Sequence, residues 1–211
     1  MTEIAPMVFV VDDDPSVRRS VNRLLKSSGH RAETFATARE FLQRDAYPGP
    51  TCLVLDLQLP DLDGLEVQQV LAGTDHSIPI VFISGHGDIP ASVRAMKNGA
   101  LDFLPKPFAA RDLLRVIEEA LERSRQEQKA HLEVAVIRDR LARLTPREYE
   151  VLCCVVSGKL NKQIAADLGV GEKTIKVHRG RVMEKMGVHT VADLVRVTEK
   201  GGVIPAPVAC A

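Results

Sequence analysis

No apolar run in this 211-residue sequence is long enough to cross a lipid bilayer. The longest apolar stretches, residues 7–11 and 78–83, have the length of a β-strand, whereas a membrane helix needs about 20 apolar residues in a row. The N-terminus also lacks the basic and then apolar pattern of a secretory signal. We therefore expect a cytoplasmic protein without a membrane partner.

Cysteine is scarce as well, and the four that occur, at positions 52, 153, 154 and 210, form no CxxC pair. This scarcity argues against a zinc site, a redox motif or a disulfide scaffold, and it favours cysteines that pack as small apolar side chains. With 45% hydrophobic and 27% charged residues, the composition is that of an ordinary folded protein rather than a disordered one.

The length suits two compact domains, because single cores usually stop growing at around 100–200 residues. The net charge is zero, which on its own would argue against a nucleic-acid partner. However, residues 1–121 carry 12 Lys+Arg and 17 Asp+Glu, whereas residues 145–211 carry 10 and 7. An acidic region of net charge −5 therefore precedes a basic region of net charge +3.

The acidic region alternates short β-branched apolar runs with stretches of helical periodicity, which predicts a parallel α/β fold. The third and fourth strands are apolar throughout, as expected of central strands that are covered by helices on both faces. We expect strands near residues 7–12, 31–35, 51–56, 78–84 and 101–105, and helices near 15–28, 37–45, 64–72, 89–98 and 110–121.

Residues 122–143 are rich in Glu, Arg, Gln and Ala and contain neither Gly nor Pro. This composition indicates a helical linker, which can carry orientation or a dimer contact between domains where a flexible tether cannot. A solvated helix without a signalling role is the alternative. The domain division that we expect is therefore 1–121, a linker at 122–143, and 144–211.

The C-terminal region is predicted to be entirely helical. Thr145 supplies an N-cap, Pro146 stands at the first helical position and Glu148 at the third, which together form a strong helix start. Glycines at 158, 169, 171 and 187 mark the breaks. The expected helices lie near residues 146–157, 161–168, 172–186 and 190–199.

Polar residues follow the strands of the acidic region where a parallel sheet binds its ligands, beyond the carboxyl ends. The first strand ends in Asp12, Asp13 and Asp14, the third in Asp56, the fourth in Ser84, and the fifth runs into Lys106. Converging carboxylates repel one another unless a cation neutralises them. Mg²⁺ (or Mn²⁺) suits such a site because it prefers oxygen ligands and tolerates a phosphate. Asp56 could then attack a phosphoryl donor in line, while the metal and Lys106 neutralise charge on the transferring group.

These residues resemble the receiver domain of two-component response regulators, over roughly residues 7–121. The matching segments are FVVDDD at 9–14, LVLDLQLP at 53–60, Gly64, SGH at 84–86 and FLPKPF at 103–108. The resemblance implies a five-stranded parallel, flavodoxin-like fold. It also implies the following roles: phosphoacceptor, Asp56; metal ligands, Asp12 (through water), Asp13, Asp56 and the Gln58 carbonyl; phosphoryl binding, Ser84 and Lys106; switch aromatic, Phe103.

The same resemblance implies a cis bond between Lys106 and Pro107. Asp14 is a separate case, because the residues themselves suggest that it caps the first helix or is a solvated acid.

Residues 161–186 read as a short amphipathic helix, a glycine turn and a second helix, the pattern of a helix-turn-helix in which the second helix enters the major groove. On that helix Ile175, Val182 and Met186 share one face, which must be core. The opposite face carries Lys173, Val177 and Arg181, with Lys176 at its edge. Lysine and arginine can contact guanine or phosphate, and valine can contact a thymine methyl.

Residues 145–199 resemble the LuxR-type helix-turn-helix of the NarL/FixJ subfamily, through LTPRE at 144–148, NKQIA at 161–165 and TIKVH at 174–178. The resemblance implies that Lys173, Thr174, Lys176, Val177 and Arg181 form the DNA-binding face, and that the fourth helix makes a dimer contact. Some relatives carry a long basic residue where Gly180 stands, so base specificity cannot be transferred from them. The implied partners are a sensor histidine kinase, promoter DNA, RNA polymerase and, after phosphorylation, a second copy of the chain.

Two other readings compete with a phosphorylation-switched transcription factor. Aspartate-dependent phosphatases also combine an Asp nucleophile with Mg²⁺, but their motif is Asp-x-Asp, in which the second acid helps to hydrolyse the phospho-intermediate. Gln58 stands at that second position here and cannot act as a general acid or base. We therefore expect no enzyme beyond self-phosphorylation and slow dephosphorylation. A receiver that is not phosphorylated is the other reading, and the complete acidic set argues against it.

Overall fold

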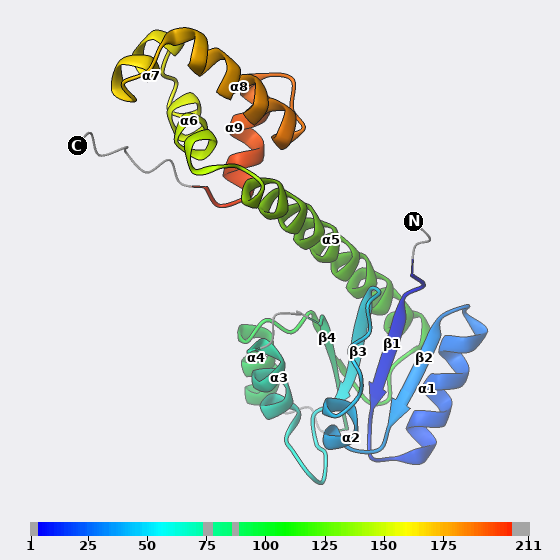
Figure 1. Ribbon diagram of the computed structural model, residues 1–211. Coiled ribbons are helices and arrows are strands. Elements are labelled where there is room, and N and C mark those ends of the chain that lie inside the picture. Colours follow the sequence, from blue (N-terminus) through cyan, green and yellow to red (C-terminus); the bar gives the residue numbers. More distant parts are fainter. Residues whose placement is uncertain (1–3, 74–77, 86–88, 204–211) are drawn as a thin grey trace. The chain divides into compact units, whose positions relative to one another are not determined.

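The computed structural model describes residues 4–73, 78–85 and 89–203, so His86 and Cys210 lie outside the described residues. The chain divides into two compact units, Met1–Gln128 and Lys129–Ala211 (Figure 1). No helix within the described ranges combines the length and apolarity that a membrane span requires.

The N-terminal unit is a parallel five-stranded sheet with the strand order β2-β1-β3-β4-β5. This arrangement confirms the predicted α/β fold, with the third and fourth strands inside the sheet. The strands are β1 (Met7–Val11), β2 (Arg31–Phe35), β3 (Thr51–Asp56), β4 (Ile80–Ser84) and β5 (Asp102–Pro105). The helices are α1 (Pro15–Ser27), α2 (Ala38–Leu42), α3 (Gly64–Ala72), α4 (Ile89–Lys97) and α5 (Ala110–Ala142).

Alternating side chains of the inner strands build two separate cores, because successive residues of a strand point to opposite faces. Phe9, Leu53 and Leu55 pack with α2, α3 and α4 on one face. Val8, Val10 and Val54 pack with α1 and α5 on the other. Helices therefore cover both faces of the sheet, and polar side chains can gather only at its edges (Figure 1).

Helix α5 runs unbroken for 33 residues, through the segment that the sequence suggests as a helical linker. Its first part contributes Leu113, Val116 and Ile117 to one of the two cores of the N-terminal unit. Further along, the Ser124 hydroxyl accepts a hydrogen bond from the Thr51 amide at 3.0 Å, and Ser124 is buried. The helix therefore remains attached to the N-terminal unit beyond residue 121.

The C-terminal unit packs four helices and the end of α5 around one core: α6 (Pro146–Val156), α7 (Asn161–Asp167), α8 (Glu172–Met186) and α9 (Val191–Lys200). Thr145 and Glu148 form a capping box at the start of α6, which confirms the predicted helix start. Ile175, Val182 and Met186 of α8 are fully buried, as the helical pattern predicts. Ile137 of α5 belongs to the same core.

Candidate functional site

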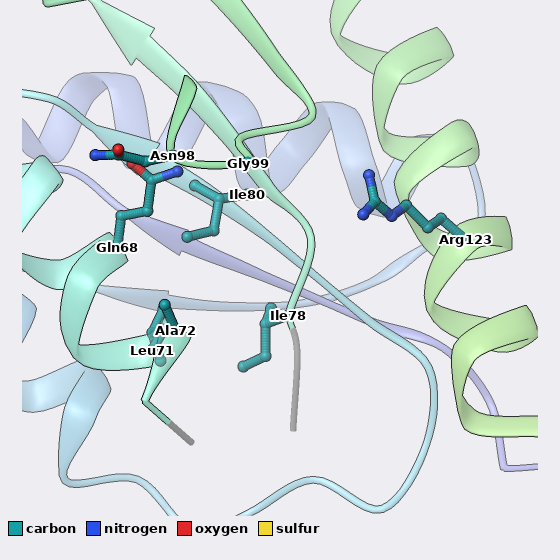
Figure 2. Close-up of a pocket in the computed structure, with 8 residues that line it drawn as sticks. All are labelled: Gln68, Leu71, Ala72, Ile78, Ile80, Asn98, Gly99 and Arg123. Atoms are coloured by element: carbon teal, nitrogen blue, oxygen red, sulfur yellow. The ribbon is translucent and has the colours of Figure 1, made fainter. Parts of the chain in front are cut away.

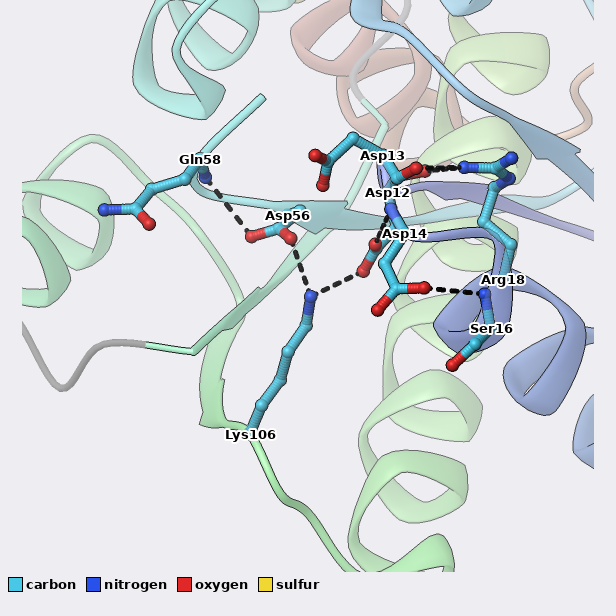
Figure 3. A network of polar contacts seen from close by, with 8 residues as sticks. All are labelled: Asp12, Asp13, Asp14, Ser16, Arg18, Asp56, Gln58 and Lys106. Carbon is cyan, nitrogen blue, oxygen red and sulfur yellow. Dashed lines mark hydrogen bonds and ion pairs between the residues drawn. The ribbon is translucent and has the colours of Figure 1, made fainter. Parts of the chain in front are cut away.

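The acidic side chains meet at the carboxyl edge of the sheet, because β1 and β3 are neighbours and pair Val11 with Leu55. Asp12 follows β1 and is completely buried, Asp56 ends β3 and is buried, and Asp13 is exposed. One carboxylate oxygen from each of the three lies within 4.8 Å of the others. The structure thus brings together the three acids that the sequence singles out (Figure 3).

Lys106 lies between two of these acids. Its ammonium group donates to Asp12 Oδ2 and to Asp56 Oδ2, each at 2.6 Å. The Lys106–Pro107 bond is cis, as the resemblance implies. Burial alone would lower the pKa of Lys106, but its hydrogen bonds to the two carboxylates outweigh that effect and raise the pKa. Lys106 is therefore positively charged beside the candidate acceptor.

The carboxylate oxygens of this cluster are suitable ligands for a divalent cation. Burial raises the pKa of Asp12 above its ordinary value, although the hydrogen bond from Lys106 works against this rise. A carboxylate buried so deeply beside two further acids gains from a cation that takes hard oxygen ligands. The cluster of Asp12, Asp13 and Asp56 is typical of the Mg²⁺ site of receiver domains.

Arg18 and Asp14 lie beside the acidic cluster, and the sequence pattern selects only Asp14. The Arg18 guanidinium donates to the backbone carbonyls of Asp12 and Asp13 from one turn into α1, and no sequence signal marks it. Asp14 is the N-cap of α1 and accepts from the Ser16 amide at 2.7 Å, which confirms the capping interpretation. That bond lowers the pKa of Asp14. Figure 3 shows both residues beside the acids.

The remaining sequence-selected residues of this unit lie on β4, just after β3, and on β5. Ser84 ends β4, is buried, and stands one residue beyond Ile83, the register partner of Asp56. The backbone N–H of Gln58 donates to Asp56 Oδ1 at 3.2 Å. The side chain of Gln58 points away from the carboxylates (Figure 3). Phe103 is half-buried on β5 and packs partly against the core.

A cavity of about 290 Å³ at the opposite edge of the sheet is separate from this site. It lies beside Ile80 at the start of β4, with the amides of Gln68 and Asn98 close together on one side and Arg123 of α5 on the other (Figure 2). The acids stand where their strands end, so this cavity plays no part in their chemistry.

The candidate DNA-binding face is the exposed side of α8. Lys173, Thr174, Lys176 and Arg181 are exposed there, and Val177 is half exposed. The opposite side of the helix is buried in the core. Arg179, which the pattern does not select, donates instead to Asn161 Oδ1 at the start of α7 and so joins the two helices of the motif.

Comparisons with known proteins agree with both halves of the chain. Residues 8–118 match the family model of the response regulator receiver domain, and residues 142–198 match that of bacterial regulatory proteins of the luxR family. The chain is 48% identical to nodulation protein W of Bradyrhizobium diazoefficiens, over 93% of this chain and 87% of that protein. It is 38% identical to the transcriptional regulatory protein FixJ of the same species, over 93% and 96%.

Solved structures give the same picture. The low-resolution structure of the response regulator StyR is 45% identical and covers 93% of this chain and 100% of that chain, with a TM-score of 0.85. Full-length FixJ from B. japonicum is 36% identical and covers 96% and 100%, with a TM-score of 0.56.

Proposed function

Because this chain belongs to the FixJ/NarL subfamily of response regulators, with a receiver domain and a LuxR-type DNA-binding domain, we propose that phosphoryl transfer to Asp56 switches its binding to promoter DNA. The family is one of transcription regulators and not of conventional enzymes, and a receiver implies a histidine kinase as partner. The observation that carries the proposal is the convergence of Asp12, Asp13, Asp56 and Lys106 at one edge of the sheet.

The transfer step uses the Asp56 carboxylate as the nucleophile. One of its oxygens forms a bond to phosphorus while the bond between phosphorus and the kinase histidine breaks, and the histidine nitrogen keeps that electron pair. Mg²⁺ or Mn²⁺, held by Asp12 (through water), Asp13, Asp56 and the Gln58 carbonyl, would neutralise charge on the transferring group. Lys106 lies 2.6 Å from Asp56 Oδ2 and can pair with a phosphoryl oxygen.

Ser84 and Phe103 form the switch. Ser84 hydrogen-bonds a phosphoryl oxygen and Phe103 turns inward, which reshapes the neighbouring surface of α4 and β5. That surface carries an unusual apolar stripe, since Ile89, Val93 and Met96 of α4 are 74%, 45% and 46% exposed. Contiguous exposed apolar side chains mark interaction sites. We infer that the stripe becomes the dimer contact after phosphorylation.

A two-fold dimer suits DNA with paired half-sites, each read by one copy of α8. Lys173, Thr174, Lys176, Val177 and Arg181 contact the major groove and its phosphates in this proposal, which their exposure supports. RNA polymerase is the partner that would read out a bound dimer at a promoter. Response regulators typically act in the cytoplasm, and we propose the same location for this chain.

Phosphorylation of Asp56 is tested by incubating the full chain with a small phosphodonor and Mg²⁺ and measuring its intact mass. The wild type should gain one phosphoryl group, Asp56→Asn should gain none, and Asp45→Asn, which removes an exposed acid of the same unit, should behave as the wild type. Chelating the metal should abolish labelling. An Asp56→Asn protein labelled as fully as the wild type would show that another residue is the acceptor.

A further inference from the structure

The C-terminal end of α8 is held by the last turns of α5. The Arg140 guanidinium of α5 donates to the backbone carbonyl of Met186, the last residue of α8, at 2.8 Å. In return, the Lys185 ammonium of α8 reaches the Arg143 carbonyl just beyond the end of α5, at 3.1 Å. Each helix therefore provides a cation for a backbone carbonyl at the end of the other.

Both bonds have a clear electrostatic basis. The last four carbonyls of a helix lack partners within it and carry partial negative charge, so cationic donors bind them more strongly than neutral ones. The turn after α8 ties down two earlier carbonyls, through Gly187 N to Glu184 O and Val188 N to Met183 O. Arg140 binds the Met186 carbonyl, which those two turn bonds do not use.

The glycine at the end of α8 fits this arrangement for two reasons. Gly187 has φ +66°, a left-handed conformation that side chains disfavour. A Cβ on Gly187 would also lie 3.0 Å from Arg140 Nη1 and 3.2 Å from its Cζ. The guanidinium therefore packs directly against the backbone of the turn, so the contact is close-packed as well as hydrogen-bonded.

The contact joins two elements with different tasks. Helix α8 carries the candidate DNA-binding side chains, and α5 is the helix whose first part belongs to the receiver core. A helix of 15 residues is about 22 Å long, so a tilt of about 5° about its C-terminal end would move its first turn by about 2 Å. Lys173 and Thr174 lie in that first turn.

We propose that Arg140 is a positioning residue for DNA recognition, which fixes α8 to α5 at the angle that DNA binding requires without contacting the DNA itself. The inference rests on the proposed DNA-binding function and deepens it. It assigns to the end of α5 a role in how α8 is presented to the groove, in addition to joining the two units.

The test uses the full chain and a duplex that the phosphorylated wild type selects from random DNA. Arg140→Gln removes the cationic donor and should weaken binding about tenfold, the scale of a lost charge-assisted hydrogen bond. Arg140→Lys keeps a cationic donor and should recover most of that loss. Arg138→Gln removes the same charge from an exposed position of the same helix and should change affinity less than about threefold, as a peripheral charge does.

Two further measurements separate positioning from other roles. If Arg140 contacted a DNA phosphate directly, Arg140→Gln would make the plot of log affinity against log salt less steep by about one. If Arg140 acts by positioning, the steepness stays as in the wild type. Ile137→Val trims the same core by one methyl group, which lowers the Tm, and leaves the Arg140 bond intact. If affinity follows stability alone, Ile137→Val and Arg140→Gln should weaken binding equally for the same loss of Tm.

The inference is overturned if Arg140→Gln binds as the wild type, if its salt slope falls by about one, or if Ile137→Val reproduces its effect. A failure of the proposed function is distinct from these outcomes, because a wild type that selects no sequence from random DNA would fail before any variant is measured.

Discussion

Gly64 shows how a single residue shapes the phosphoacceptor edge. It begins α3, and a Cβ on it would lie 2.8 Å from the carbonyl oxygen of Asp56 and 3.0 Å from both Leu57 Cα and a Phe82 ring carbon. The Gly64 amide also donates to the Leu57 carbonyl at 2.9 Å. Backbone therefore packs on backbone at this point, and only glycine leaves enough room beside the candidate acceptor.

Gly64→Ala should destabilise the N-terminal unit by about 1–3 kcal/mol, because the added methyl group meets rigid backbone rather than a movable side chain. Gly73→Ala is the matched control, since its Cβ would meet nothing closer than 3.5 Å. Denaturant unfolding of both variants measures the difference. Equal stabilities would mean that the backbone around Asp56 moves more easily than its packing implies.

Glu148 offers a prediction about pH. The hydrogen bond from Lys185, followed by one from the Thr145 amide, lowers the pKa of Glu148 to about 2 from an ordinary value of 4.5. Because the folded-state pKa is the lower one, this carboxylate stabilises the fold above pH 4.5, and the contribution disappears as the pH falls from 4.5 towards 2.

Glu148→Gln should accordingly lower the Tm of the C-terminal unit at pH 7, and the gap to the wild type should narrow between pH 4.5 and pH 3. Glu150→Gln on the same helix, where the carboxylate is more exposed and pairs with Arg147, should have little effect at either pH. A gap for Glu148→Gln that is unchanged at pH 3 would contradict the assigned pKa direction.

At the scale of elements, the sequence predicts the regular parts well because their signals are local. The strand β3 was expected at residues 51–56 and α8 at 172–186, and both are observed with those bounds. Helix α2 is shorter than expected, Ala38–Leu42 in place of 37–45, because Thr37 is its N-cap and Gln43 is its C-cap. Three carboxylates converge as predicted since parallel strands end at one edge.

What the sequence could not predict depends on tertiary partners. Ile137 stands in a charged segment that looks solvated, yet it is buried because Gly201 allows α9 to approach, and a Cβ there would lie 2.6 Å from Ile137. Arg18 and Arg140 look like ordinary helix-surface cations, and only the fold places backbone carbonyls beside them. Local periodicity contains no information about such long-range contacts.

The apolar stripe of α4 leads to a prediction about assembly. Val93→Glu should prevent dimerisation of the phosphorylated protein, because a charge at the centre of an apolar contact is costly to bury. Val70→Glu is a matched control on α3, since Val70 is 52% exposed and Val93 is 45% exposed. Sedimentation velocity before and after phosphorylation measures the mass. If Val93→Glu still dimerises after phosphorylation, the dimer contact lies on another surface.

For the whole molecule, the open question is whether the acidic receiver masks the basic domain or only brings two copies together. A linker with few apolar positions offers little to hold a closed interface against the entropy cost of docking. Tethering two weak binders, by contrast, raises avidity by roughly 10²–10⁴ without any new DNA contact. These magnitudes favour dimerisation as the task of the receiver.

A fragment test distinguishes the two, and the structure sets its boundary. Residues 144–211, the domain expected from the sequence, would lack Ile137, which is part of the C-terminal core, so the fragment should begin at Lys129, where the second compact unit begins. We expect residues 129–211 to bind a half-site no more tightly than the unphosphorylated full chain at the same salt concentration, which must be fixed because phosphate contacts make affinity steeply salt-dependent. Fluorescence anisotropy on one labelled duplex compares them. A fragment that binds about tenfold tighter or more, a gain of about 1.4 kcal/mol, would mean that the receiver covers the DNA-binding face, and masking would replace dimerisation as the mechanism.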